Sequence, residues 1–416
     1  MPAPIRTREE TWRWRIAACG LVLTAIYVFL LAGSYKSGNW ILNRGGRPIL
    51  SDFTPIWIAG RDALDGHALR AYNLGDFHAA QRALVGPRPH YYFWPYPPIF
   101  FLPAALVALL PYALAFIFWE AAAVAAFLAL IYRILGERTA LIAALASPLL
   151  VYSCAVGQNG ALTATLIGGG LFLLKRWPLA AGCLIGCLAY KPQFDLILPL
   201  ALLISGEWGA LSAAAAATIV LIGASSLLFG VQVWTAFWAG LLKYANVALI
   251  VGVPSGTMIQ SLWVLLRHLG LGVFPSAAFQ VAMSLAAAGL VCFLWRSGAS
   301  YSLKAAAAAT ASLLVSPYLF VYDLVTLLVA GAFLAADYVE RGSSRVERAL
   351  LIALFCAQFL VVGFDTRPLG FPFGLALFAL ILWRARGQIA AGPKRSRRGS
   401  LGVSATAPDA AEFRAG

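Results

Sequence analysis

Residues 98–132 read PIFFLPAALVALLPYALAFIFWEAAAVAAFLALIY, an apolar stretch with a single charge, at Glu120. The stretch is too long for one membrane span, since a span needs about 20 residues, and Leu110-Pro111 breaks it because proline ends or kinks a helix. Residues 113–132 are long enough to cross a bilayer, whereas the first half suits a re-entrant or interfacial helix. This pattern indicates a helical protein built in a membrane.

The composition of the whole chain leads to the same class. Of the 416 residues, 61% are hydrophobic and 12% are charged, about half of the roughly 25% typical of soluble proteins. The charge balance is +14, but the cations lie at the two termini and in short links between apolar runs. This distribution follows the positive-inside rule, and it favours membrane lipids over nucleic acid as a partner.

We therefore expect an all-α integral membrane protein with about 10–12 membrane segments and a large first extracytoplasmic loop. Within that loop, helices are expected near residues 54–64 and 76–84. The Lys and Arg distribution places both termini in the cytoplasm. The expected division is a cytoplasmic N-terminus (1–15), a first span (16–34), an extracytoplasmic loop with the catalytic region (35–97), a multi-spanning domain (98–383) and a basic, disordered cytoplasmic tail (384–416).

The sequence contains no glycine-rich phosphate loop, GxSxG, HExxH or soluble nucleotide-binding segment. Its six cysteines lie in apolar runs, where a free thiol behaves as a small hydrophobic side chain. Cys183 and Cys187 are one helical turn apart, but no histidine or further cysteine accompanies them. We expect neither a metal nor a cofactor, and nothing in the sequence fixes an oligomeric state.

Polar residues at the bilayer are costly and are therefore functional candidates. Lys191 lies in AYKPQFD, in the middle of a long apolar run. Pro192 disfavours helix at Lys191, so two half-helices should meet there, and a cation at such a break suits a phosphate. The alternative is a lysine that snorkels at an ordinary turn, with Asp195 as its local partner.

Asp52 opens the segment SDFTPIWIAG in the long loop. An aspartate at the membrane face could accept a proton from a sugar hydroxyl. The alternative is a helix N-cap, because Asp52 precedes a plausible helix with Pro55 near its start. From spacing alone, the cap is the better interpretation.

Further polar and aromatic residues fall on the same predicted side. Gln158-Asn159 form a charge-free link, and Asp323 interrupts SPYLFVYDLVTLL. The stretch 90–98, HYYFWPYPP, is dense in aromatics, as in an interfacial belt or a stacking platform for a sugar or isoprenoid chain. Glu120 is a carboxyl inside a span, where helix association and the lining of a lipid pathway are equally good interpretations.

Several motifs occur together in a characteristic order. They are Asp52-Phe53 with Gly66 and Tyr72, Tyr96-Pro97-Pro98 with Pro103 and Leu110-Pro111, Gly157-Gln158-Asn159, Ala189-Tyr190-Lys191-Pro192-Gln193, and Ser316-Pro317-Tyr318 with Tyr322-Asp323. This series, over about residues 50–330, resembles glycosyltransferase family 87, a group of bacterial membrane mannosyltransferase-like proteins.

The resemblance implies a GT-C fold in the bacterial plasma membrane, with an active site on the outer face. It implies transfer of a hexose, mannose first, from a polyprenyl-phosphate carrier to a lipid or glycan acceptor, without a nucleotide-sugar or an obligatory metal. Asp52 would be the catalytic base and Lys191 would face the lipid phosphate. The substrate-binding set would be Lys191, Gln158, Asn159, Gln193, Tyr318, Tyr322, Asp323 and Tyr96.

Two other classes compete with a glycosyltransferase. Broken helices and intramembrane polar residues also mark secondary transporters, although no inverted repeat is visible and the polar residues cluster at the predicted outer face. A lipid-binding assembly subunit without catalysis is the third class. In that case Asp52 would be replaceable.

Overall fold

The computed structural model describes residues 8–245 and 258–391, and within them the chain is helical and has no β-strand. The α-helices are α1 (Arg8–Ser37), α2 (Phe53–Leu64), α3 (Leu74–Val85), α4 (Phe101–Ala108), α5 (Tyr112–Leu135), α6 (Arg138–Leu145), α7 (Pro148–Val156), α8 (Gly160–Leu173), α9 (Pro178–Gly186), α10 (Ile197–Ser205), α11 (Trp208–Phe229), α12 (Gln232–Ala245), α13 (Leu262–His268), α14 (Val273–Arg296), α15 (Tyr301–Leu314), α16 (Thr326–Arg341), α17 (Arg345–Gly363) and α18 (Gly370–Ala390).

Short 3-10 helices connect several of the α-helices. They are η1 (Ala68–Tyr72), η2 (Pro98–Phe100), η3 (Cys187–Tyr190), η4 (Pro192–Phe194) and η7 (Val321–Val325). The helices expected in the long loop are confirmed as α2 and α3, and the expected break at Leu110-Pro111 separates the short α4 from the full-length α5.

The protein is a multi-pass membrane protein. In the described part, 7 helices are long and apolar enough to cross a bilayer, or up to 8 when α6 and α7, bent by 56°, count as one broken span. Three shorter apolar helices, Pro98–Ala108, Gly160–Leu173 and Pro178–Tyr190, add to these. The sequence estimate of about 10–12 segments included such short runs, which form helices inside the bundle and do not reach full span length.

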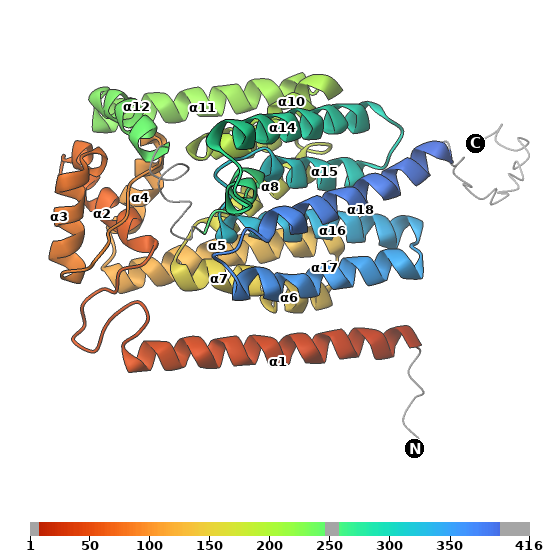
Figure 1. The fold of residues 1–416 in the computed structure, drawn as a ribbon, viewed down its shortest axis with the longest axis horizontal. Coiled ribbons are helices and arrows are strands. Elements are labelled where there is room, and N and C mark those ends of the chain that lie inside the picture. The colour runs from red at the N-terminus through yellow and green to blue at the C-terminus, as the bar shows by residue number, and fades with distance from the viewer. Residues whose placement is uncertain (1–7, 246–257, 392–416) are drawn as a thin grey trace, which may run out of the picture.

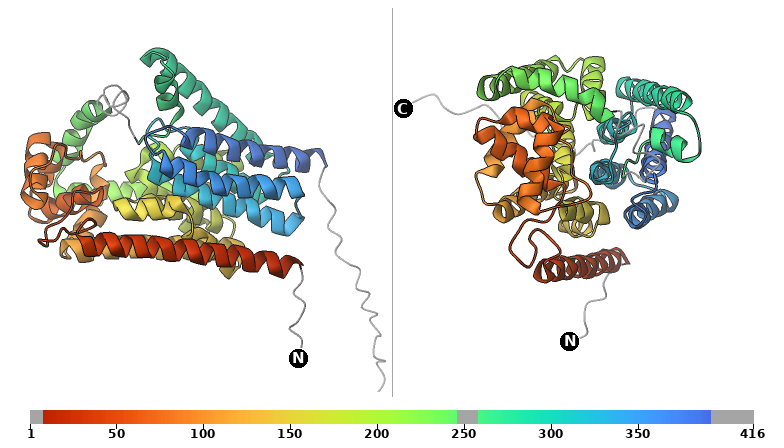
Figure 2. Two further views of the ribbon diagram at one scale, coloured as in Figure 1. Left: turned by 60° about the horizontal axis from the view of Figure 1, so that its bottom comes forward. Right: turned by 60° about the vertical axis from the view of Figure 1, so that its left-hand side comes forward.

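The long helices run roughly side by side (Figure 1). Helices α2, α3, α4 and α12 gather at one end of the bundle, and the start of α1 and the end of α18 lie at the other (Figures 1 and 2). The two described ends of the chain therefore lie at the same end of the bundle. The basic tail beyond residue 391 and the first seven residues are outside the described part.

Small residues allow the helices of the core to approach closely. Ala305–Ala309 of α15 are completely buried. Gly182 and Gly186 of α9 lie one turn apart against α11, where an added Cβ would come within 2.2 Å of the Ala210 carbonyl oxygen and 2.4 Å of that of Ala214. Small residues one turn apart are typical of membrane helix contacts, because they let backbones meet.

The predicted break around Lys191 is confirmed. Helix α9 ends at Gly186, η3 and η4 flank Lys191, and α10 begins only at Ile197. Lys191 itself has non-helical backbone angles, φ −130° and ψ 68°, and proline disfavours helical angles in the residue before it. The two half-helices thus leave Lys191 at an irregular position inside the protein.

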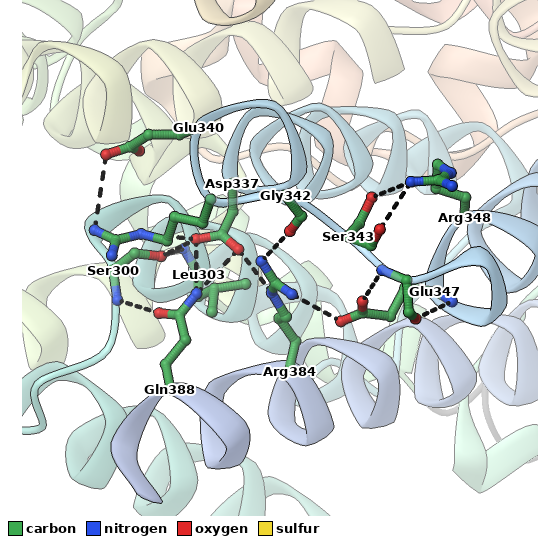
Figure 3. Close-up of polar contacts among 12 residues, drawn as sticks. Ser300, Leu303, Asp337, Glu340, Gly342, Ser343, Glu347, Arg348, Arg384 and Gln388 are labelled. Carbon is green, nitrogen blue, oxygen red and sulfur yellow. Dashed lines mark hydrogen bonds and ion pairs between the residues drawn. The ribbon is translucent and has the colours of Figure 1, made fainter. Parts of the chain in front are cut away.

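A buried polar network joins α15, α16, α17 and α18 (Figure 3). Asp337 of α16 is fully buried and accepts hydrogen bonds from Arg384 Nε at 2.9 Å, Ser300 Oγ at 2.5 Å and Gln388 Nε2. Arg384 also contacts Glu347 at 3.1 Å and donates to the Gly342 carbonyl at 2.6 Å. The carboxylates and the guanidinium are thus mutually satisfied, as buried charges must be.

Replacing Arg384 with methionine is expected to cost roughly 3 kcal/mol of stability, because a buried Asp337 would lose its main cation. The effect should be at the low end for such pairs, since Arg341 Nε remains 3.4 Å from Asp337 Oδ1 and Ser300 and Gln388 still donate to Asp337. A lowered melting temperature in detergent measures it. The matched control is Arg348→Met, because Arg348 is exposed and bonds only to Ser343 in the described part. Equal melting of both variants would contradict the assigned role.

Candidate active site

The backbone at Asp52 is held in place from two sides. The Asp52 amide donates to the carbonyl of Val156, the last residue of α7, at 3.1 Å. Next to it, Phe53 is fully buried and packs edge-on against Phe116 of α5, with ring centroids 5.2 Å apart. Gly157, with φ +79°, permits this contact, because an added Cβ would lie 2.6 Å from the Phe53 Cβ. Asp52 is therefore fixed at the junction of the long loop and the membrane bundle.

The side chain of Asp52 does not cap α2. Asp52 occupies the N-cap position, but its φ and ψ are helical and it makes no side-chain cap hydrogen bond, so the cap interpretation is wrong. Burial instead raises the pKa of the Asp52 carboxyl to about 6, although hydrogen bonds with Tyr92 and Gln158 act in the opposite direction. A partly buried carboxylate with a raised pKa has the properties of a general base.

Tyr92 is positioned over Asp52 by helix α3. Gln81 of α3 is fully buried, donates to the Tyr92 carbonyl at 2.8 Å and accepts from the Tyr92 amide at 2.9 Å. Burial raises the pKa of Tyr92, and the charge of Asp52 and the hydrogen bond between Asp52 and Tyr92 raise it further. The phenol thus stays protonated and serves Asp52 as a donor.

Three predicted residues form one hydrogen-bonded group beside Asp52. The Tyr96 hydroxyl donates to Gln158 Oε1 at 3.2 Å and accepts from Asn159 Nδ2 at 2.9 Å. All three side chains are buried. Since Gln158 also contacts Asp52, this group connects the carboxylate to the interior of the bundle.

Lys191 and Asp323 form a buried ion pair. Lys191 Nζ lies 2.5 Å from Asp323 Oδ1, and their side chains are 5% and 1% exposed. The other Asp323 oxygen accepts from the Phe320 amide at 3.2 Å. Rings of Tyr322 and Phe194 lie 5.1 and 5.6 Å from the ammonium. Asp323, and not the neighbouring Asp195, is therefore the partner of Lys191.

A cavity of about 410 Å³ opens beside this ion pair. Six of the predicted residues line it, and the remaining wall is mostly apolar and includes residues of α11 and α12. The six are Tyr96, Lys191, Gln193, Tyr318, Tyr322 and Asp323. Ile222 and Trp238 also line the cavity and are 40% and 61% exposed, so the apolar part communicates with the membrane-facing surface.

Asp52, Gln158 and Asn159 do not line the cavity, but they adjoin it through Tyr96. The aromatic stretch 90–98 divides between the two regions. Tyr92 contacts Asp52, Trp94 stacks on Phe101, and Tyr96 faces the cavity. Glu120 is buried next to Cys154 and takes no part in either region. In the described residues, no group of three or more His, Cys, Asp or Glu side chains could hold a metal ion.

The family model for glycosyltransferase family 87 matches residues 94–317, more than half of the chain. The chain belongs to glycosyltransferase family 87. No curated protein and no solved structure was found to match it. This family 87 protein is a membrane glycosyltransferase, and membership sets the transporter and the non-catalytic subunit aside.

The match includes Tyr96, Gln158, Asn159, Lys191 and Gln193. It ends just before Tyr318 and leaves out Asp52, Tyr322 and Asp323. Only the structure places Asp52, Tyr318, Tyr322 and Asp323 next to the matched residues.

Sequence reasoning missed Tyr92 and the wall from α12. Tyr92 lay in the quoted aromatic stretch, but nothing local marks it among its neighbours. Helix α12 carried a signal in its two indoles, Trp234 and Trp238, close to an apolar span.

Proposed function

We propose that this family 87 enzyme transfers a hexose, with mannose as the first candidate, from a polyprenyl-phosphate carrier to a lipid or glycan acceptor on the extracytoplasmic face. The shape and polarity of the cavity carry the proposal. Its polar end holds Lys191, Gln193 and Asp323, and its apolar wall reaches the membrane-facing surface at Ile222 and Trp238. A donor with a sugar, a phosphate and a long hydrocarbon chain fits a cavity with a polar end and an apolar wall.

In the proposed reaction, Asp52 accepts the proton of the acceptor hydroxyl while that oxygen forms a bond to the anomeric carbon. The bond from the anomeric carbon to the phosphate oxygen breaks, and the polyprenyl phosphate leaves with its electron pair. Lys191 faces the additional negative charge on the phosphate. The single displacement inverts the anomeric configuration, and a phosphate leaving group requires no general acid.

The position of Asp52 supports its role as base. It lies outside the cavity but is linked to the cavity wall by Gln158 and Tyr96. The acceptor would therefore approach from the loop side and the donor from the membrane side. The transferred sugar would then lie between the acceptor and the donor phosphate. It would be bound by Gln158, Asn159, Tyr318, Tyr322 and Asp323.

The proposal is tested with purified protein in lipid nanodiscs, given radiolabelled polyprenyl-phosphate mannose and a membrane lipid extract. Label is expected to move to the extract, whereas a nucleotide-linked mannose should not serve as donor. Transfer from the nucleotide sugar alone, or failure with a panel of polyprenyl-phosphate sugars, would contradict the proposal.

The apolar wall gives this test a matched pair of variants. Trp238→Ala removes part of the wall and is expected to raise the KM for a long-chain donor about tenfold, through roughly 1–2 kcal/mol of lost apolar contact. A donor with a short prenyl chain should be affected little. Trp208 is 63% exposed and does not line the cavity, so Trp208→Ala is the control. If Trp238→Ala and Trp208→Ala change the KM of the long-chain and the short-chain donor to the same extent, the prenyl chain of the donor does not bind along this wall.

A further inference from the structure

A second carboxylate, Asp365, lies near Asp52 although the two are far apart in the sequence. Asp365 belongs to the link between α17 and α18 and is partly exposed. Tyr152 of α7 donates a hydrogen bond to Asp365 Oδ2 at 3.2 Å. The Asp52 carboxylate is within electrostatic range of the same phenol, so one hydroxyl is bonded to Asp365 and lies in the neighbourhood of Asp52.

The link that carries Asp365 is held rigidly. Gln260 is fully buried and donates from Nε2 to the Asp365 carbonyl at 2.7 Å. Its Oε1 accepts from the amide of Gly370, the first residue of α18, at 2.8 Å. One glutamine therefore fixes both sides of the link, and the Asp365 carboxylate has a defined place.

Tyr152 is fixed relative to Asp52 through α7. Tyr152 lies one turn before Val156, and the Val156 carbonyl holds the Asp52 amide at 3.1 Å. Tyr92, the hydrogen-bond partner of Asp52, is within electrostatic range of the same phenol. Asp52, Tyr92 and Tyr152 thus surround one partly exposed region, and the positions of all three depend on buried backbone contacts.

We propose that Tyr152, oriented by Asp365, determines acceptor specificity by accepting a hydrogen bond from a hydroxyl next to the one that Asp52 deprotonates. The inference rests on the proposed function. The acceptor would then be a polyol with neighbouring hydroxyls, such as a neutral sugar.

The chemistry follows from the single proton of a phenol. A tyrosine hydroxyl is one donor and an acceptor. Tyr152 directs its proton to Asp365, with Met258 Sδ at 3.2 Å as a weaker alternative. Its oxygen therefore remains an acceptor toward the substrate, as does Asp52. Two acceptors side by side suit two neighbouring hydroxyl donors.

The charges support a neutral acceptor group. In the described part of the chain, neither Asp52 nor Asp365 forms an ion pair. The neighbouring groups that shift the pKa values of Asp52, Tyr92 and Tyr152 include carboxylates and phenols but no lysine or arginine. A phosphate or carboxylate on the acceptor would be repelled here, whereas hydroxyls find acceptors.

The experiment uses the full-length enzyme with polyprenyl-phosphate mannose as donor. The acceptor probes are methyl mannoside, methyl glucoside and methyl galactoside, each compared with its monodeoxy analogues, with the lipid extract run in parallel. Wild type is expected to use at least one glycoside, and to lose about tenfold to 100-fold in kcat/KM when the neighbouring hydroxyl is removed.

Tyr152→Phe should abolish this discrimination, raising the acceptor KM about tenfold or more while leaving the donor KM unchanged. Asp365→Asn keeps an acceptor for the phenol proton and should retain most of the discrimination, whereas Asp365→Ala should lose it. A merely structural role would not separate these two variants. Tyr132→Phe, at the exposed far end of α5, is the control.

Transfer to the lipid extract but to none of the glycosides would overturn the inference. Equal use of parent glycosides and deoxy analogues by wild type would overturn it as well, and so would a Tyr152→Phe enzyme that still discriminates. The proposed function would stand in each of these cases. A lack of transfer to the extract would instead overturn the proposed function.

Discussion

Asp52→Asn is expected to lower sugar transfer by on the order of 10²- to 10⁴-fold, the usual contribution of a general base. The variant keeps the volume of the side chain and its place beside Tyr92 and Gln158, so donor binding should change little. The measurement is single-turnover transfer from polyprenyl-phosphate mannose in nanodiscs. Asp65→Asn is the control, because Asp65 is an exposed carboxylate at the end of the same helix.

The pH dependence provides a second readout for Asp52. A base must be ionised, so the wild-type kcat/KM should rise with pH through an apparent pKa of about 6. The folded carboxyl binds its proton more tightly than the usual value of 3.8. The stability contributed by this group is therefore present below pH 3.8 and is lost as pH rises toward 6. Asp52→Asn should consequently be no less stable than wild type at neutral pH.

Wild-type transfer rates in Asp52→Asn would place the base elsewhere. A flat wild-type profile between pH 5 and 7 would be the corresponding contradiction from the pH series. Loss of transfer together with a markedly lower melting temperature would assign Asp52 a structural role, which its missing cap bond does not suggest.

Lys191→Met is expected to have the largest combined effect on stability and activity. It leaves Asp323, which is 1% exposed, as a buried charge without its cation, and such losses cost about 3–5 kcal/mol. It should also lower transfer on the order of 10²-fold or more, because the ammonium at the polar end of the cavity would no longer face the leaving phosphate. Melting temperature and single-turnover transfer separate the two effects.

A double-mutant cycle distinguishes folding from chemistry. Lys191→Met with Asp323→Asn removes both charges and keeps an acceptor for the Phe320 amide, so most of the stability should return. Transfer should stay low, because the cation is still missing. Recovery of transfer in the double variant would show that Lys191 serves only to neutralise Asp323. Asp323→Asn alone completes the cycle, because it leaves Lys191 as the unpaired buried charge.

Local chemistry was sufficient to predict several features of the fold. The scarcity of charge indicated a membrane protein, and prolines located the breaks at Leu110-Pro111 and Lys191-Pro192. The number of full-length spans was harder to predict, because hydropathy does not separate a lipid-facing helix from a short one buried by its neighbours. Helix α15 illustrates this, since its alanines are completely buried by packing.

The sequence by itself indicated the membrane class, the helix breaks and six of the residues that line the cavity, because hydrophobicity, proline geometry and residue type act locally. Only the tertiary structure decided which of these residues meet. Lys191 and Asp323 are 132 positions apart, and Tyr152 and Asp365 are 213 apart. Such pairs depend on how whole helices pack, and one sequence contains no local signal for a contact between distant side chains. In the same way, the packing leaves Asp52 at the N-cap position of α2, but its side chain bonds to Tyr92 and Gln158 and does not cap the helix.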